Sequence, residues 1–239
     1  MNIRKPLLTA AGIAVVLSAA ALLPSCSDDN KGPHYGPDQT FQQILRVEEW
    51  NDGVINAFAD FMAIEIQTGK LVSCELERQS SITANGVKLT YNYVDPNDKY
   101  SYAYGERISA PNQEVTFVFT RMPGLTFTNT VKLNNTPFIR LPSTTILENG
   151  THYTYTSSLG VITNSAISIY VVAKDGKEAG KRYEADIFND TYSFQNVPAG
   201  NYVLQSTATD SYPVKEQNGT SGGTMYSTKV FEVPNVRFK

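Results

Sequence analysis

The chain has 239 residues, and its 20 Lys and Arg against 23 Asp and Glu give a formal net charge of −3. This mild acidic balance argues against nucleic acid and anionic lipid surfaces as partners. The two histidines, His34 and His152, are too distant in sequence to support a histidine-based triad or zinc site. Cys26 and Cys74 offer no disulfide framework, and Cys74, in a strand-like run, is expected to be buried and unreactive.

The first 25 residues have the three parts of a secretory signal. Arg4 and Lys5 form a basic start, an uncharged apolar run follows over 7–23, and a small residue stands before Cys26. The run is short and rich in alanine for a stable membrane-spanning helix. An uncut signal anchor is the alternative. We therefore expect residues 1–25 to be removed as a signal peptide on export.

The sequence Leu23-Pro24-Ser25-Cys26 resembles the lipobox of bacterial lipoproteins, although Pro24 replaces the more usual Ala, Ser or Thr. The resemblance implies that the Cys26 thiol receives a diacylglyceryl group. It also implies that a peptidase cuts before Cys26 and that the freed amine takes a further acyl chain such as palmitate. Each buried CH₂ contributes about 0.8 kcal/mol, so two or three chains hold a protein firmly on a membrane. The implied partner of Cys26 is therefore the membrane itself.

The residues after Cys26 suggest a cellular location. Ser27-Asp28-Asp29 is similar to the acidic export signal of surface lipoproteins in Bacteroidota-type bacteria. This similarity implies the outer membrane, with the body exposed to the medium. The alternative is an ordinary solvated tether. Residues 26–40 also hold two glycines and two prolines without an apolar period, so we expect a flexible lipidated tether there.

Residues 41–62 are the one region with a helical pattern. Apolar residues recur there at spacings of three and four, and Asn51-Asp52-Gly53 interrupts them. The pattern predicts a short helix, a break, and then a second short helix or a lead into a strand. The apolar residues are Phe41, Ile44, Leu45, Trp50, Val54, Phe58, Phe61 and Met62.

From about residue 63 onward, apolar and polar residues alternate in short runs rich in Val, Ile, Thr, Tyr and Phe, which is typical of β-strands. Strands about every 8–12 residues, joined by short turns, predict an all-β fold of the antiparallel β-sandwich type. Clear alternating runs are 87–93, 115–119, 125–128, 167–171 and 229–233. Turn signals are Asn85-Gly86, Asn149-Gly150, Asp175-Gly176 and Ala199-Gly200.

A second resemblance lies in the C-terminal part. Residues 192–204 read YSFQNVPAGNYVL, which is similar to the hairpin of prealbumin-like and Cna-B-like sandwich modules. Tyr192 and Phe194 then share one strand face, and Tyr202 and Leu204 share one face of the partner strand. The resemblance implies the sandwich fold and carries over no cross-link.

Two tandem sandwiches follow from these patterns. The first, with the helical lead-in, is expected at 41–162, and the second, prealbumin-like or Cna-B-like, at 163–239. The boundary rests on the loop-like sequence Ser157-Ser158-Leu159-Gly160. One larger sandwich is the alternative.

Tyrosines gather in the middle of the first expected domain. Tyr91 and Tyr93 alternate on one predicted strand, and Tyr100, Tyr102 and Tyr104 alternate on the next. If these strands pair across the intervening turn, five rings share one surface that suits stacking against sugar rings. The alternative is that the rings fill the core or pack across strands. These tyrosines are the candidate ligand-binding residues.

Paired carboxylates are the remaining route to catalysis. Glu48 and Glu49 lie in the helical region, and 95–98 holds two aspartates, but nothing places two of them across a cleft as a glycosidase needs. The turn 95–98 also offers oxygen ligands for calcium, with a plain turn as the alternative. No Gly-x-Ser-x-Gly elbow occurs, and 219–224 is typical of a flexible loop. We therefore expect a protein that is not an enzyme and that uses neither metal nor cofactor.

Three functions stay open. The first is a lipid-anchored cell-surface binding or adhesion protein, with a carbohydrate or a surface protein as partner. The second is a structural accessory of fimbrial or envelope assembly. The third is a glycan-acting hydrolase. An exposed tyrosine face favours the first, a long unpaired edge strand the second, and two carboxylates in a cleft the third.

Overall fold

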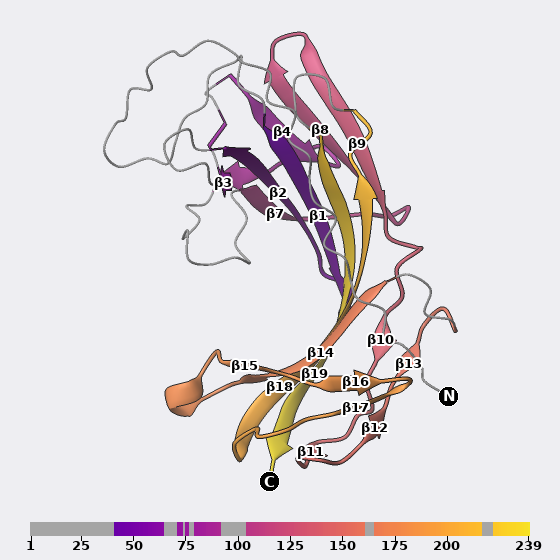
Figure 1. Ribbon diagram of the computed structural model, residues 1–239. Helices are drawn as coiled ribbons and strands as arrows, with labels where there is room; N and C mark the ends of the chain where they lie inside the picture. Colours follow the sequence, from indigo (N-terminus) through magenta and orange to yellow (C-terminus); the bar gives the residue numbers. More distant parts are fainter. Residues whose placement is uncertain are drawn as a thin grey trace, which may run out of the picture. The chain divides into compact units, whose positions relative to one another are not determined.

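The computed structural model describes seven stretches of the chain, all within one compact unit, Gly32–Lys239 (Figure 1). The signal sequence, Cys26 and the tether lie outside the described residues, as do His34, Cys74 and the turn 95–98. The described stretches are 41–64, 71–73, 75–76, 79–91, 104–160, 165–216 and 222–239.

Ten strands form the largest sheet, with the first strand of the chain in its middle (Figure 1). β1 (Gln42–Trp50) has β19 (Gly223–Phe238) on one side and β2 (Ile55–Ile64) on the other. Beyond β19 follow β18 (Gly200–Pro213), β14 (Ala166–Ala173) and β15 (Arg182–Glu184), and beyond β2 follow β7 (Tyr104–Ile108) and β6 (Thr90–Tyr91). In addition, β3 (Leu71–Ser73) pairs with β2, and β11 (Ile146–Leu147) pairs with β19.

Three smaller sheets complete the described structure. The four-stranded sheet has the order β5 (Val87–Lys88), β4 (Ser81–Ala84), β8 (Glu114–Met122) and β9 (Leu125–Lys132). The three-stranded sheet has the order β12 (Tyr153–Thr154), β17 (Thr191–Ser193) and β16 (Asp186–Phe188). The two-stranded sheet pairs β10 (Ile139–Arg140) with β13 (Thr156–Ser157), and the one helical turn, η1, is a 3₁₀ turn at Gly176–Glu178.

The predicted all-β fold of the sandwich type is confirmed. Neighbouring strands are antiparallel except for two pairs, β1 with β19 and β11 with β19, which are parallel. The turn predicted at Asn85-Gly86 joins β4 to β5, and both of its residues have positive φ, 47° and 81°. This is the conformation that a tight two-residue hairpin turn needs, and Asn and Gly tolerate it best.

The helical segment predicted within 41–62 is wrong, because these residues form β1 and β2. The predicted break at Asn51-Asp52-Gly53 is real, but it is the turn between two strands. Buried and half-buried residues alternate along β1 with the period of two that a strand requires. The alternation is obscured in the sequence because Ile44 and Phe58 lie on the face opposite Leu45, so both faces carry apolar side chains.

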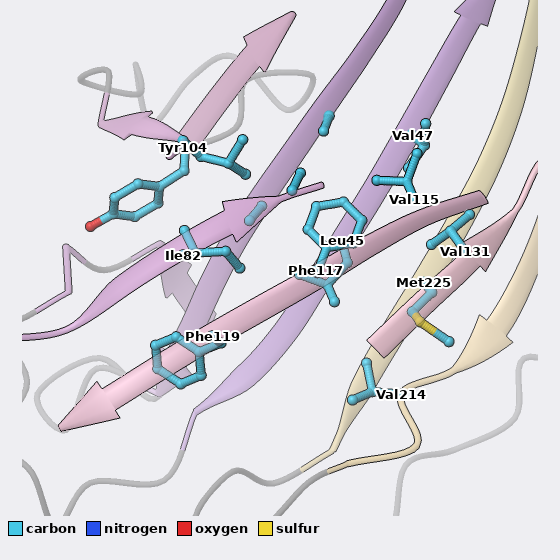
Figure 2. Close-up of a cluster of buried hydrophobic side chains, with 14 of the residues drawn as sticks. Leu45, Val47, Ile82, Tyr104, Val115, Phe117, Phe119, Val131, Val214 and Met225 are labelled. Atoms are coloured by element: carbon cyan, nitrogen blue, oxygen red, sulfur yellow. The ribbon is translucent and has the colours of Figure 1, made fainter. Parts of the chain in front are cut away.

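Two buried clusters lie on one face of the large sheet, which we call its inner face. The first cluster packs the inner face against the four-stranded sheet, and Figure 2 shows Leu45 and Val47 of β1 beside Phe117 of β8. The second cluster packs β14, β18 and β19 against the two smallest sheets, with Ile139 and Tyr192 among its members. Register pairs connect the two clusters through β18 and β19 without a change of face.

The two clusters do not divide the chain at the expected boundary of 162–163. The first cluster holds residues up to Leu133 and also Val214 and Met225 from β18–β19, whereas the second begins at Ile139. The long hairpin β18–β19 therefore serves both clusters, since strands of 14 and 16 residues extend across both. The boundary at 162–163 stays a prediction that rests on a loop signal, and such a signal does not report which core the flanking strands enter.

The four aromatic and apolar residues of the motif at 192–204 are buried as expected, but the two strands of the motif do not pair with each other. Tyr192, Phe194, Tyr202 and Leu204 are all buried in the second cluster. However, β17 pairs with β12 and β16, and β18 pairs with β14 and β19. The two strands of the expected hairpin therefore belong to different sheets, which contribute to the same cluster from different layers.

Asparagine side chains connect distant segments through hydrogen bonds to the backbone. Asn51, Asn85, Asn129 and Asn149 each accept a backbone N–H bond and donate to a backbone carbonyl far away in the sequence. Asn149 accepts from Val197 N at 3.0 Å and donates to Val197 O at 2.9 Å. A carboxamide can pair with a peptide group in this way because it carries both a donor and an acceptor.

Candidate binding face

Only two of the five candidate tyrosines lie within the described residues. Tyr91 of β6 and Tyr104 of β7 are directly opposite each other, so the two strands that carry them pair in this region. Their rings lie 5.2 Å apart, and Tyr104 is 8% exposed within the first cluster. Tyr93, Tyr100 and Tyr102 lie outside the described residues.

Tyr104 is therefore a core residue and not part of an exposed stacking surface. Its ring also meets Phe61 edge-on at 5.8 Å, and its hydroxyl accepts a hydrogen bond from Leu76 N at 2.8 Å. In Figure 2 this hydroxyl points away from the other labelled side chains of the cluster. Tyr91 is partly buried and packs against the same cluster. The described part of the tyrosine group thus follows the alternative in which the rings pack in the core.

The two candidate carboxylates of the first strand do not form a catalytic pair. Glu48 and Glu49 are neighbours on β1, so their side chains point to opposite faces of the large sheet. Glu48 pairs with Arg46 at 2.5 Å, and Glu49 contacts the ammonium group of Lys229 on the inner face. His152 is exposed, and no group of three or more His, Cys, Asp or Glu within the described stretches is arranged to hold a metal ion.

The outer face of the large sheet, opposite the two clusters, carries a different set of side chains. All three smaller sheets contribute buried residues to the clusters, so none of them packs on the outer face. Strand register places polar and aromatic residues from five strands together on this face. The polar ones are Arg46, Glu48, Arg182, Glu184, Gln205, Thr228 and Glu232, the aromatic ones are Trp50 and Tyr170, and Val230 lies between Thr228 and Glu232 on β19.

One row of this face runs across four strands, and we call it the binding row. Glu184 of β15 lies opposite Tyr170 of β14, Tyr170 opposite Gln205 of β18, and Gln205 opposite Glu232 of β19. Gln205 Nε2 donates to Glu232 Oε2 at 2.6 Å. Neighbouring strands lie about 4.8 Å apart, so the row presents a polar side chain at each such step.

Paired charges and a stacked ring organise the face. The guanidinium of Arg182 lies 3.3 Å from the ring centre of Tyr170, a cation–π contact, and Arg182 Nε pairs with Glu184 Oε1 at 2.5 Å. Arg46 pairs in the same way with Glu48, two residues further along β1. Each of these two arginines is thus neutralised by a carboxylate of its own strand, and the face has little net charge at its centre.

Burial and neighbouring charges shift the pKa of two groups on this face. Burial raises the pKa of Glu48 above its ordinary value, while Arg46 and a hydrogen bond from Trp50 oppose that rise. Burial also raises the pKa of Tyr170, and Arg182 and Glu48 are among the charges that act on its hydroxyl.

The side chains of this face offer hydrogen-bonding groups to a ligand. Amide, carboxylate and guanidinium groups supply hydrogen-bond donors and acceptors in one row, and the half-buried Trp50 adds aromatic surface, whereas Tyr170 is 8% exposed beneath the Arg182 guanidinium and supports the row from below. A ligand rich in hydroxyl groups meets both needs, because hydroxyls donate and accept while sugar rings stack on aromatic faces. This face could not be predicted from the sequence, because its residues come from strands far apart in the chain.

In the part of the chain that the structure describes, no helix is long and apolar enough to cross a membrane. No family model matches the chain, and no curated protein is similar to it.

Proposed function

We propose that this protein is a lipid-anchored binding or adhesion protein of the bacterial outer-membrane surface. The anchor is the acylated Cys26, the tether is 26–40, and the β-sandwich body faces the medium. The proposal of an anchor is supported by the basic start, the apolar run and the lipobox-like residues before Cys26. The acidic residues Asp28 and Asp29 support surface exposure.

The ligand that we propose is a glycan, bound on the outer face of the large sheet. The observation that carries this proposal is the binding row, in which Tyr170, Gln205 and Glu232 occupy directly opposed positions on three strands. The row supplies hydrogen-bonding groups, and the half-buried Trp50 supplies aromatic surface on the same face; glycan recognition uses both. The row takes the place of the tyrosines proposed from sequence, because its ligand contacts come from the half-buried Gln205 and Glu232 and the exposed Glu184, whereas Tyr104 is in the core.

Two experiments test the two halves of the proposal. The body from residue 27 onward should bind a limited set of sugars on a glycan array. An array without any binding would contradict the proposal that the ligand is a glycan. Metabolic labelling with palmitate should label the wild type but not Cys26→Ser. Protease shaving of intact cells should then release the body, and full protection would contradict surface exposure.

A structural role in fimbrial or envelope assembly is the second candidate, and the edge strand β9 favours it. β9 has eight residues and pairs with β8 alone among the described strands. Thr128 N donates to Glu216 Oε2 at 2.5 Å, so a side chain covers the middle of this edge instead of a strand. An added strand would protect β9 amides from hydrogen exchange in envelope complexes, and unchanged exchange there would count against assembly.

A further inference from the structure

A single strand connects the tether to the body. β1 begins at Gln42, directly after the tether, and any pull on the anchor enters the body there. The strand lies between two others, with eight register pairs to the parallel β19 and eight to the antiparallel β2. It is therefore held by hydrogen bonds on both edges along its whole length.

The binding row lies at the opposite end of β1 from the tether. The last residue of the strand, Trp50, is level with Val230 of β19, and Glu232 follows two residues further on. Asn51 extends the attachment past the end of β1, because its amide donates to Glu232 O and its oxygen accepts from Glu232 N. A pull between the anchor and a ligand held at the Glu232 end of the row would therefore act nearly parallel to β1, because β19 is the neighbouring strand.

The direction of this load decides how the strand resists it. A force along the strand axis shears the β1–β19 and β1–β2 ladders, so all their hydrogen bonds carry load together. A force across the axis opens a ladder one pair at a time, which needs less force at each step. Shear would also draw Leu45 and Val47, both fully buried, out of the first cluster, and would separate Glu49 from Lys229.

We infer that β1 is a load-bearing strand, which allows the anchored protein to hold a bound ligand against a pull such as fluid flow. This inference rests on the proposed anchor at Cys26 and the proposed ligand in the binding row. The chain order places the tether at one end of β1, and the strand register places the binding row at the other. Both placements are needed for shear.

Single-molecule force measurements on the chain from Cys26 onward test the inference. The unacylated thiol of Cys26 serves as the first handle, with Cys74→Ser in every sample. In one sample the second handle is Lys239→Cys, beyond the far end of β19. In the matched control it is Lys215→Cys, which lies beside the start of β19 because Val214 N bonds to Gly223 O. Lys215 and Lys239 are both exposed, so neither handle disturbs the core.

The first sample loads β1 in shear against β19, and the control peels it from the Gln42 end. We expect the rupture force of the first sample to be severalfold higher than that of the control at the same loading rate, since forced unfolding follows the unfolding rate in each direction. Equal forces in the two samples would overturn the inference. A blank glycan array with unequal forces would remove the proposed ligand but leave the mechanical property of β1 in place.

Discussion

Substitution of Tyr104 tests most clearly whether this residue stabilises the core or contacts a ligand. The ring is 8% exposed and packs against Phe61 and Tyr91, and its hydroxyl accepts the Leu76 N–H bond. Tyr104→Ala removes a buried aromatic ring, which costs about 3–5 kcal/mol in comparable sites. Tyr104→Phe keeps the ring and loses one hydrogen bond, which costs about 1 kcal/mol. At this chain length each kcal/mol lowers Tm by about 2–4 °C, so the alanine variant should melt about 10 °C below the wild type.

Urea unfolding followed by circular dichroism, together with glycan binding measured on the folded variants, checks this expectation. The unfolding midpoints should fall in the order wild type, Tyr104→Phe, Tyr104→Ala, while binding by the folded protein stays unchanged. A Tyr104→Ala protein with the wild-type midpoint and no glycan binding would refute the reasoning. That result would place Tyr104 on a ligand surface instead of in the core.

Three further substitutions test individual interactions by urea unfolding. Tyr192 is fully buried, and its hydroxyl has no hydrogen-bond partner among the described residues. Tyr192→Phe should therefore leave the free energy of unfolding unchanged or raise it by about 1 kcal/mol. A fall of about 1 kcal/mol in the free energy of unfolding would contradict this and indicate a hydrogen-bond partner. Asn149→Asp removes the donor to Val197 O and should lower the free energy of unfolding by about 1–3 kcal/mol. An unchanged unfolding midpoint would contradict a stabilising role for the Asn149–Val197 hydrogen bonds. The raised pKa of Glu48 means that the folded state binds its proton more tightly than the unfolded state does. Stability should therefore fall as pH rises above the ordinary glutamate pKa and through the folded value. Glu48→Gln, which also loses the Arg46 ion pair, should reduce that fall, and an identical pH profile would show that Glu48 does not cause it.

Strands with one apolar face could be predicted from the sequence. In β8, Val115, Phe117 and Phe119 are buried, while Thr116 and Thr120 lie on the half-exposed face between them. This pattern can be read locally because large apolar side chains recur at every second position of the buried face from Val115 to Phe119. The tight turn at Asn85-Gly86 was equally visible, because few residue pairs tolerate positive φ at both positions.

Strand partners and the binding face could not be predicted. β1 and β19 are separated by most of the chain, and no local sequence pattern predicts their parallel pairing. The burial of Tyr104 depends on Phe61 from another strand, which the alternation of tyrosines does not reveal. The binding row likewise exists only once the register of four strands is known, since Tyr170 and Glu232 are far apart in the chain.

Titration calorimetry of one array-identified glycan tests the central claim, that the outer face of the large sheet is the binding face. The samples are the wild type, Gln205→Ala in the binding row, and Thr126→Ala on the exposed face of the four-stranded sheet as the matched control. Loss of one ligand hydrogen bond is worth about 1 kcal/mol, so Gln205→Ala should weaken Kd about fivefold or more. Thr126→Ala should bind as the wild type does. Full binding by Gln205→Ala together with weakened binding by Thr126→Ala would contradict the account and move the ligand to the other sheet.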